Sequence, residues 1–195
     1  MKNTVTGLFQ VYKNNLSSIL CEQIIERFES WDKDDRTYPG VTVSGLDRNI
    51  KDTQDLPISG FSEWKDIDME LHKALQGPIA SYLSDILNDF AVLDVKDTED
   101  TGYQIKRTTP KQRGYARHND SHYLIPQGRY RIITFLWYLN TIKEGGETEF
   151  IDRGVVEPEA GKLILFPACW TFPHIGHPPK TENKYIATGW VYSTY

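Results

Sequence analysis

Cysteine is scarce in this chain: Cys21 and Cys169 are the only two among 195 residues. Two cysteines provide no disulfide framework in a chain of this length, which favours a reducing compartment. A membrane-spanning helix needs about 18 apolar residues, and no apolar run in the chain approaches this length. The first ten residues, MKNTVTGLFQ, also lack the apolar core of a signal peptide. We therefore expect a soluble, cytoplasmic protein without a membrane partner.

Concentrated positive charge is also missing. The net charge is −5, and the acidic residues are scattered along the chain. A duplex-binding protein normally presents a basic face, because neutralising phosphates provides most of its affinity. The nearest feature is one short basic run, which we interpret as part of a pocket or a solvated hairpin: Lys106, Arg107, Lys111, Arg113 and Arg117. We expect no nucleic-acid partner.

The composition is otherwise that of a globular protein, with 39% hydrophobic and 25% charged residues. The length fits one domain, residues 1–195, with a core of its own. An aromatic content of 12% leans toward β-structure, where flat rings pack well on a pleated face. We expect a mainly β fold with N-terminal helices.

Three helices are predicted within residues 1–100. Apolar residues at three- and four-residue spacing indicate a helix over 16–31, capped by Asn15 or Ser17. Two more helices are predicted over 62–75 and 79–90, because Gly77-Pro78 should break the pattern between them.

Two polar segments separate the predicted elements. Residues 32–60 form a stretch that is long for a loop without a function, and residues 121–128 form a shorter one. Both are candidate lids, and solvent-exposed connectors are the alternative.

After residue 100 the pattern changes to short alternating segments separated by turn residues, which predict strands. The predicted strands are 103–107, 114–117, 130–139, 147–151, 162–166 and 184–192. This spacing suggests an antiparallel barrel or sandwich over residues 101–195.

Four of the five histidines fall in two clusters that have metal-ligand spacing. His118 and Asp120 are two residues apart, so on a strand they share a face, roughly 6.6 Å apart along the axis. One imidazole and one carboxylate, completed by an imidazole from another strand, form the facial triad of non-haem iron oxygenases. His122 would lie too far from His118 for one ion. The third ligand is His174 or His177, and strand placement favours His174.

A lysine begins the last predicted strand. Lys184 shares a face with Ile186, Thr188 and Trp190, where an unpaired ammonium is costly to bury. A dicarboxylate that chelates iron at one end would satisfy Lys184 at the other, whereas an exposed strand end is the alternative. On the strand 131–139, the hydroxyls of Thr134 and Tyr138 could join the same carboxylate or be core hydroxyls.

Taken together, these stretches resemble the prolyl 4-hydroxylase-like branch of the Fe(II)/2-oxoglutarate-dependent dioxygenases, in the family's order over residues 103–192. The matching segments are Tyr115–Asp120, Arg131–Asn140, Gly145–Phe150, Gly161–Pro167, Trp170–His174 and Lys184–Trp190. The resemblance implies a double-stranded β-helix, or jelly-roll, core. It also implies Fe(II), 2-oxoglutarate and O2 as cofactor and cosubstrates, with ascorbate as a further candidate.

The resemblance also implies roles for individual residues. It selects His174 as the third ligand, because the family's basic residue follows the distal histidine by about ten positions, where this chain has Lys184. Tyr138 matches a position that helps to hold the distal carboxylate, Thr134 lines the same pocket, and Trp190 matches a large residue near the iron.

The chain departs from the family at one place. Members often carry a pocket tyrosine nine or ten residues before the first histidine ligand, where this chain has Thr109 and Thr108, while Tyr103 lies further upstream. Either the cosubstrate pocket is completed differently, or an insertion within 109–112 displaces the alignment.

The implied activity is hydroxylation of an unactivated C–H bond, with release of succinate and CO2. The branch favours a proline residue in a peptide or protein as substrate, with a free amino acid or another small molecule as the alternative. Two other hypotheses are a metal-binding jelly-roll module without catalysis and a cupin-like iron enzyme that does not use 2-oxoglutarate. Oligomeric state is not predicted.

Overall fold

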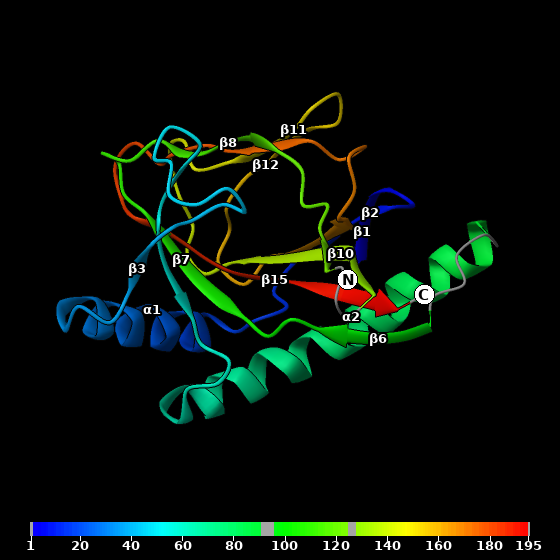
Figure 1. The fold of residues 1–195 in the computed structure, drawn as a ribbon, viewed down its shortest axis with the longest axis horizontal. Coiled ribbons are helices and arrows are strands. Elements are labelled where there is room, and N and C mark those ends of the chain that lie inside the picture. Colours follow the sequence, from blue (N-terminus) through cyan, green and yellow to red (C-terminus); the bar gives the residue numbers. More distant parts are fainter. Residues whose placement is uncertain (1, 91–95, 125–127, 195) are drawn as a thin grey trace.

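The computed structural model describes residues 2–90, 96–124 and 128–194. Figure 1 shows three layers: a small sheet with β8, β11 and β12, a larger sheet with β10, β15 and β7, and the helices α1 and α2 on its far side. The expectation of antiparallel β-structure with N-terminal helices is confirmed at this level. Neither helix of the described residues is both long and apolar enough to span a membrane.

The larger sheet contains ten antiparallel strands among the described residues, in the order β1-β2-β13-β10-β15-β7-β5-β3, with β6 on β15 and β9 on β10. Its strands are β1 (Lys2–Thr6), β2 (Phe9–Tyr12), β3 (Tyr38–Pro39), β5 (Gln54–Pro57), β6 (Lys96–Asp100), β7 (Gln104–Thr108), β9 (Tyr123–Leu124), β10 (Arg129–Tyr138), β13 (Leu163–Pro167) and β15 (Lys184–Thr194). The two long strands β10 and β15 pair over most of their length and form its centre.

The smaller sheet contains five strands among the described residues, in the order β12-β11-β14-β8-β4. Its strands are β4 (Lys51–Asp52), β8 (Gly114–His118), β11 (Thr148–Phe150), β12 (Gly154–Val156) and β14 (His174–Gly176). This sheet carries the two predicted histidine ligands on neighbouring strands, β8 and β14.

Alternation along β10 divides the core in two. Ile133, Phe135 and Trp137 belong to the cluster shared with the helices. Leu136 and Tyr138 belong to a second cluster, which contains Phe150 of the smaller sheet and therefore lies between the sheets. The face of β10 that carries Leu136 and Tyr138 is thus directed at the smaller sheet, so a site between the two sheets would be lined by this face.

Helix α1 (Ser18–Lys33) agrees with the predicted helix over 16–31. Ser17 is the cap: its side chain accepts a hydrogen bond from the backbone N–H of Leu20 at 3.1 Å. The buried face of α1 packs in the core shared with the larger sheet through Ile24 and Phe28, as their helical spacing predicted.

The predicted helix break at Gly77-Pro78 is wrong. After a 3-10 turn, η1 (Ser62–Trp64), a single helix α2 (Lys65–Phe90) runs through Pro78. Proline lacks the N–H that would bond to the carbonyl of Ala74 four residues earlier. The side chain of Asn15 donates to that carbonyl instead, at 3.2 Å, so tertiary structure supplies the hydrogen bond that the helix lacks.

The largely helical interpretation of residues 1–100 is also too simple. The N-terminal hairpin β1-β2 extends the larger sheet, and the polar stretch 32–60 contributes β3, β4 and β5 to the two sheets. Short strands at sheet edges gain stability from pairing with their neighbours, which local sequence does not encode. The other candidate lid, 121–128, falls partly outside the described residues, because 125–127 are not described.

Candidate metal centre and cosubstrate pocket

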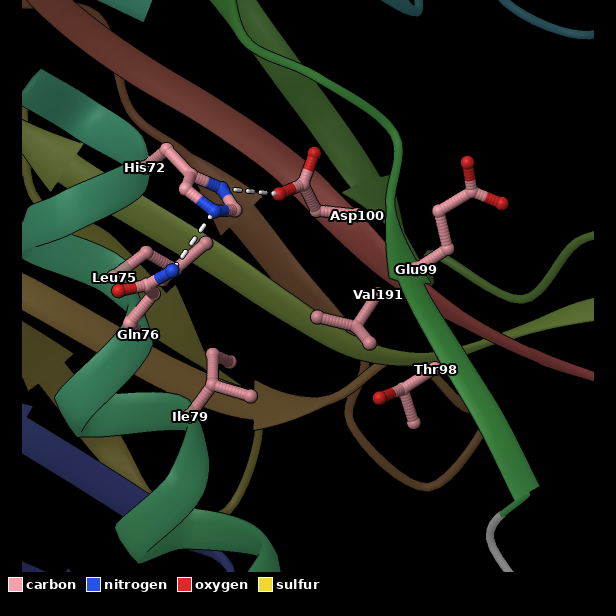
Figure 2. Close-up of a pocket in the computed structure, with 8 residues that line it drawn as sticks. All are labelled: His72, Leu75, Gln76, Ile79, Thr98, Glu99, Asp100 and Val191. Carbon is pink, nitrogen blue, oxygen red and sulfur yellow. Dashed lines mark hydrogen bonds and ion pairs between the residues drawn. The ribbon is translucent and has the colours of Figure 1, made fainter. Parts of the chain in front are cut away.

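His72 lies apart from the predicted site. It lines a pocket between α2 and β6, where Figure 2 shows its ring between Asp100 and Gln76. Nδ1 lies 3.1 Å from a carboxylate oxygen of Asp100, and Nε2 lies 3.0 Å from Nε2 of Gln76. Because both ring nitrogens are hydrogen-bonded, His72 has no free lone pair for a metal ion.

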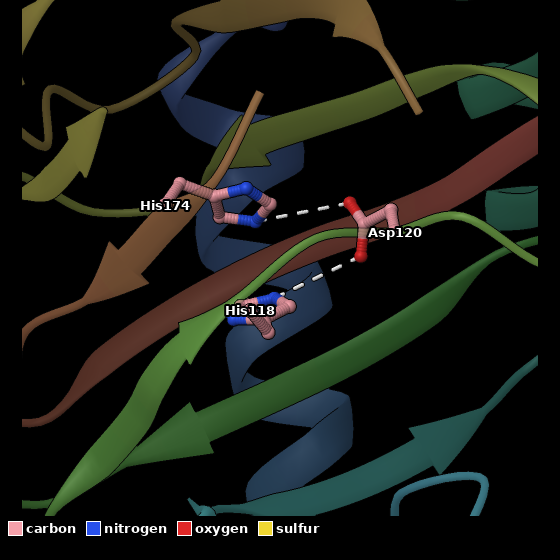
Figure 3. A group of neighbouring side chains, drawn as sticks. All are labelled: His118, Asp120 and His174. Atoms are coloured by element: carbon pink, nitrogen blue, oxygen red, sulfur yellow. Dashed lines mark ion pairs between the residues drawn. The ribbon is translucent and has the colours of Figure 1, made fainter. Parts of the chain in front are cut away.

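His118, Asp120 and His174 converge between the sheets (Figure 3). His118 ends β8 and His174 begins β14, and the two residues are direct partners in the antiparallel pair. Nε2 of His118 lies 3.7 Å from Oδ1 of Asp120, and Nε2 of His174 lies 3.8 Å from Oδ2. One ligand atom from each residue fits within 4.8 Å of the others.

The backbones of β8 and β14 approach closely beside these ligands. Gly114 begins β8 with a φ of +76°, and a Cβ added there would lie 2.2 Å from the carbonyl oxygen of Gly176. A side chain would separate the strands, so glycine is needed for the pairing that places His118 opposite His174.

Hydrogen bonds fix both imidazoles in the ligand tautomer. Nδ1 of His118 lies 2.8 Å from the carbonyl oxygen of Ala116, and Nδ1 of His174 lies 3.0 Å from that of Phe172. A carbonyl accepts only, so each Nδ1 carries a hydrogen, and Nε2 is the ring nitrogen that remains available to a metal ion. Burial, followed by the proximity of His174, lowers the pKa of His118 to about 3, which keeps its ring neutral.

Asp120 is held in its charged form. Burial acts against the carboxylate, but His174, His118 and a hydrogen bond from Thr134 together lower its pKa below the usual range. The Thr134 hydroxyl donates to Oδ2 at 2.8 Å. Two imidazoles and one carboxylate are the donor set of a non-haem Fe(II) site. The residues present therefore fit the metal that the sequence implied.

His177 and His122 lie outside this group. His177 pairs with Glu149, with 2.7 Å between Nε2 and Oε2. The group of three that could hold a metal among the described residues contains neither histidine. The geometry thus favours His174 over His177, as the ten-residue spacing to Lys184 had.

Lys184 lines the same pocket as the three ligands and is 5% exposed. Its Nζ has one hydrogen-bond acceptor among the described residues, the carbonyl oxygen of His177 at 3.4 Å. Burial lowers the pKa of Lys184 to about 8, with Glu147 acting in the opposite direction. A buried ammonium with one long hydrogen bond is a ready site for an anion.

Thr134 and Trp190 also line the pocket, whereas Tyr138 does not. The Tyr138 hydroxyl lies behind the pocket wall, 2.7 Å from Oγ1 of Thr148, and Thr148 is the residue that reaches the cavity. Tyr138 is therefore placed to orient Thr148, while Thr134 contacts Asp120.

The structure shows what stands in place of the pocket tyrosine that many family members carry before the first histidine ligand. Tyr103 faces the helices, packed against Phe135 and Trp137, so it does not replace a pocket tyrosine. Thr108 lines the pocket directly opposite Lys184 in the β7–β15 pair. The pocket is thus completed without a tyrosine from β7.

Three residues in or beside the pocket were missed as site residues by the sequence analysis. The Tyr115 ring stacks on His118 with 3.4 Å between centroids, and Lys106 lies on the floor with Thr108. Arg131 stacks over Trp190, with its guanidinium carbon 3.5 Å from the ring centroid. Alternation along 103–108 would have placed Lys106 inward. The predicted basic run therefore does not form one surface, because Arg107 faces α1 and pairs there with Glu29 and Asp32.

Comparison with known proteins agrees with this geometry. Residues 103–192 match the family model of the 2OG-Fe(II) oxygenase superfamily, and they include all three candidate ligands and Lys184. No curated protein matches the chain.

Several solved prolyl hydroxylases share the fold. A viral collagen prolyl hydroxylase from Paramecium bursaria Chlorella virus-1, in complex with 2OG, superposes with a TM-score of 0.67 at 20% identity, over 96% of this chain and 97% of that one. A Pseudomonas putida prolyl-4-hydroxylase gives 0.67 at 18% identity, over 94% and 91% of the two chains. A Trichoplax adhaerens prolyl hydroxylase, in complex with a hypoxia inducible factor peptide fragment, gives 0.70 at 20% identity, over 96% and 84%.

These findings confirm the expected oxidoreductase class and, through the family, Fe(II), 2-oxoglutarate and O2. Residues 103–192 form a domain of the 2OG-Fe(II) oxygenase superfamily, and the chain has the fold of solved prolyl hydroxylases.

Proposed function

We propose that this protein hydroxylates a prolyl residue of a peptide or protein, using Fe(II) held by His118, Asp120 and His174. In this proposal the two facing sheets are the halves of a double-stranded β-helix, and the site lies between them. The observation that carries the proposal is the pocket itself, because it combines the three-residue donor set with the buried ammonium of Lys184.

Each residue has a defined task in this function. The triad would hold Fe(II), and the bound metal would supply activation of O2. Lys184 binds the distal carboxylate of 2-oxoglutarate. Thr134 orients Asp120, and Tyr138 acts through Thr148. Trp190 and Arg131 form a wall beside the metal centre.

A peptide substrate is supported by a groove that adjoins the pocket. The groove and the pocket share Lys106, Tyr115, Asp120 and Trp190. The groove extends over the segment 38–43, within which Val41 and Val43 are exposed. The Trichoplax enzyme, with a similar fold, was solved with a peptide fragment. In this function the segment 38–43 forms one wall of the substrate site.

The test is oxygen incorporation into prolyl peptides. Purified protein with Fe(II) and 2-oxoglutarate would be incubated with a library of proline-containing peptides, and product mass and succinate would be measured together. We expect a gain of one oxygen atom on proline, with one succinate formed per product and no product from the His174→Ala variant. Succinate release without oxygen incorporation into any peptide would contradict a prolyl substrate, and a screen of free amino acids would follow.

The cytoplasmic location expected from the sequence is likewise a proposal. Cys21 and Cys169 are both free thiols, which supports a reducing compartment. Fractionation of cells that produce the native protein would test it.

A further inference from the structure

Lys106 is a second buried lysine of the pocket, distinct from Lys184. It is 7% exposed, and its Nζ has no hydrogen bond or ion pair with any described residue. Its nearest described aromatic contact is the Trp190 ring, with Nζ 5.6 Å from the centroid. Burying an ammonium without a partner is costly, so the position calls for an anion that is not part of the chain.

The two acidic residues near Lys106 are already engaged. Asp55 accepts hydrogen bonds at 2.6 Å from both Lys51 and Thr53. Asp120 belongs to the triad, where a bound divalent cation would more than offset its charge. Burial and the proximity of Lys51 lower the pKa of Lys106 to about 8, against the opposing effect of these two carboxylates. Neither carboxylate is therefore free to neutralise Lys106.

Two further donors lie beside Lys106. The indole Nε1 of Trp190 is buried and has no hydrogen-bond partner in the described structure. Arg131 stacks on the same indole, and among the described residues its side chain makes two long hydrogen bonds, both at 3.4 Å, to the Asp120 carbonyl oxygen and the Tyr192 hydroxyl. No carboxylate of the described residues pairs with Arg131. The ammonium of Lys106 and the guanidinium of Arg131 thus both lie close to the Trp190 ring, which also carries the indole N–H that is unpaired among the described residues.

The position of Lys106 differs from that of Lys184. In the β7–β15 pair, Lys184 is opposite Thr108, and Lys106 is opposite Ile186. Lys106 therefore lies two residues further along the pair than Lys184, on the side nearer to Trp190. Lys106 also lines the groove shared with Arg131 and Trp190, which Lys184 does not reach. The two lysines can therefore serve two different anions.

We propose that Lys106, with Arg131 and the indole N–H of Trp190, binds a carboxylate of the substrate itself, so that the enzyme selects acidic substrates. This inference rests on the proposed prolyl hydroxylase function and names the substrate class. The carboxylate has two sources of the same chemistry: a C-terminal proline, or an acidic side chain next to the target proline.

The test compares ligands that differ only in charge. The protein, loaded with Fe(II) and 2-oxoglutarate under argon, would be titrated calorimetrically with N-acetyl-L-proline and with N-acetyl-L-prolinamide. We expect the acid to bind at least about tenfold more tightly, as a charge-assisted hydrogen bond implies. In Lys106→Met the preference should fall to within about twofold, and Lys106→Arg should keep most of it. N-acetyl-prolyl-glutamic acid α-amide, which keeps its side-chain carboxylate, is titrated in parallel to distinguish the two sources. L-proline tests binding of a free amino acid, which the proposed function does not use.

Lys184→Met is the matched control, because it removes the other buried ammonium of the same pocket. It should weaken 2-oxoglutarate binding and keep the preference for the acid at saturating 2-oxoglutarate, whereas Lys106→Met should leave 2-oxoglutarate affinity nearly unchanged. Equal binding of acid and amide to the unmodified protein, no binding of any carboxylate probe, or an intact preference in Lys106→Met would overturn the proposal. Binding needs no turnover, so failure of the hydroxylase function would appear separately, in the succinate assay.

Discussion

The hydroxyl of Thr134 donates a hydrogen bond to Oδ2 of Asp120 at 2.8 Å, and both side chains are buried. Thr134 reaches Asp120 from the inner face of β10, in the sheet opposite the one that carries the two histidines. The hydrogen bond therefore couples the two sheets at the candidate metal centre. It also stabilises the carboxylate form, which is the form that binds a cation.

Replacing Thr134 with valine keeps the shape of the side chain and removes the donor. We expect Thr134→Val to fold normally and to bind Fe(II) about 10–100-fold more weakly, the usual effect of losing an outer hydrogen bond to a metal ligand. Thr134→Ser, which keeps a hydroxyl, should retain most of the affinity. Competition with a chelator would measure both variants, and equal affinity of Thr134→Val and the unmodified protein would contradict this role.

Binding of 2-oxoglutarate should depend on pH through Lys184. Only the ammonium form binds a carboxylate strongly, and burial lowers the pKa of Lys184 to about 8. The Kd for 2-oxoglutarate should therefore be nearly constant below about pH 8 and rise above it. In Lys184→Met it should be about 10–100-fold higher at pH 7, consistent with a charge-assisted hydrogen bond, and lack this rise. The same rise in the variant would exclude Lys184 as its source.

Lys184 should also lower the free energy of unfolding of the metal-free protein at neutral pH. Its pKa is lower in the folded chain than in the unfolded chain, where it is near 10.4. Between about pH 8 and 10 the unfolded chain binds the extra proton, so the free energy of unfolding rises with pH in this window.

Lys184→Met should consequently be more stable than the unmodified protein by roughly 2–3 kcal/mol at pH 7, an advantage that shrinks above pH 8. Lys162→Met is a matched control: Lys162 is equally buried, but its Nζ hydrogen-bonds to Glu159 and to the Glu157 carbonyl oxygen. That variant should be less stable. Urea unfolding at several pH values measures both, and destabilisation by Lys184→Met at pH 7 would contradict the expectation.

Asn15 should stabilise helix α2 at Pro78. Its Nδ2 donates to the Ala74 carbonyl, and its Oδ1 accepts from Nε1 of Trp137 at 2.6 Å. Asn15→Ala leaves both partners without a hydrogen bond, at a cost of roughly 2–4 kcal/mol.

In a Pro78→Ala background the helix itself supplies an N–H to Ala74, so Asn15→Ala should cost about 1 kcal/mol less there. A double-mutant cycle by urea unfolding measures the difference. Strictly additive effects would mean that Asn15 does not compensate for Pro78.

Much of the site could be predicted because short-range patterns encode it. Alternation placed Thr134 and Lys184 on inward faces, and two-residue spacing placed Asp120 with His118. The candidate third ligand was harder to predict, since His174 meets His118 through a pairing of strands more than 50 residues apart in sequence. Strand placement and the ten-residue spacing to Lys184 favoured it, but only tertiary structure brings the two rings together.

The failures have physical causes of their own. The β-bulge between Arg131 and Ile133 changes the phase of β10, so Arg131 faces Trp190 and not the helices as strict alternation implies. Pro78 did not end a helix, because Asn15 compensates from outside it. Lys106 was seen only as part of a basic run, since its isolation from carboxylates depends on Lys51 and Thr53 occupying Asp55.

The most direct test of the central claim is an anaerobic titration of the Fe(II)-loaded protein with 2-oxoglutarate, followed by visible absorption. We predict a metal-to-ligand charge-transfer band that is absent in His174→Ala and that needs more 2-oxoglutarate in Lys184→Met. Folded, iron-loaded protein that shows no band at any 2-oxoglutarate concentration would contradict the assignment of this pocket as the metal and cosubstrate site.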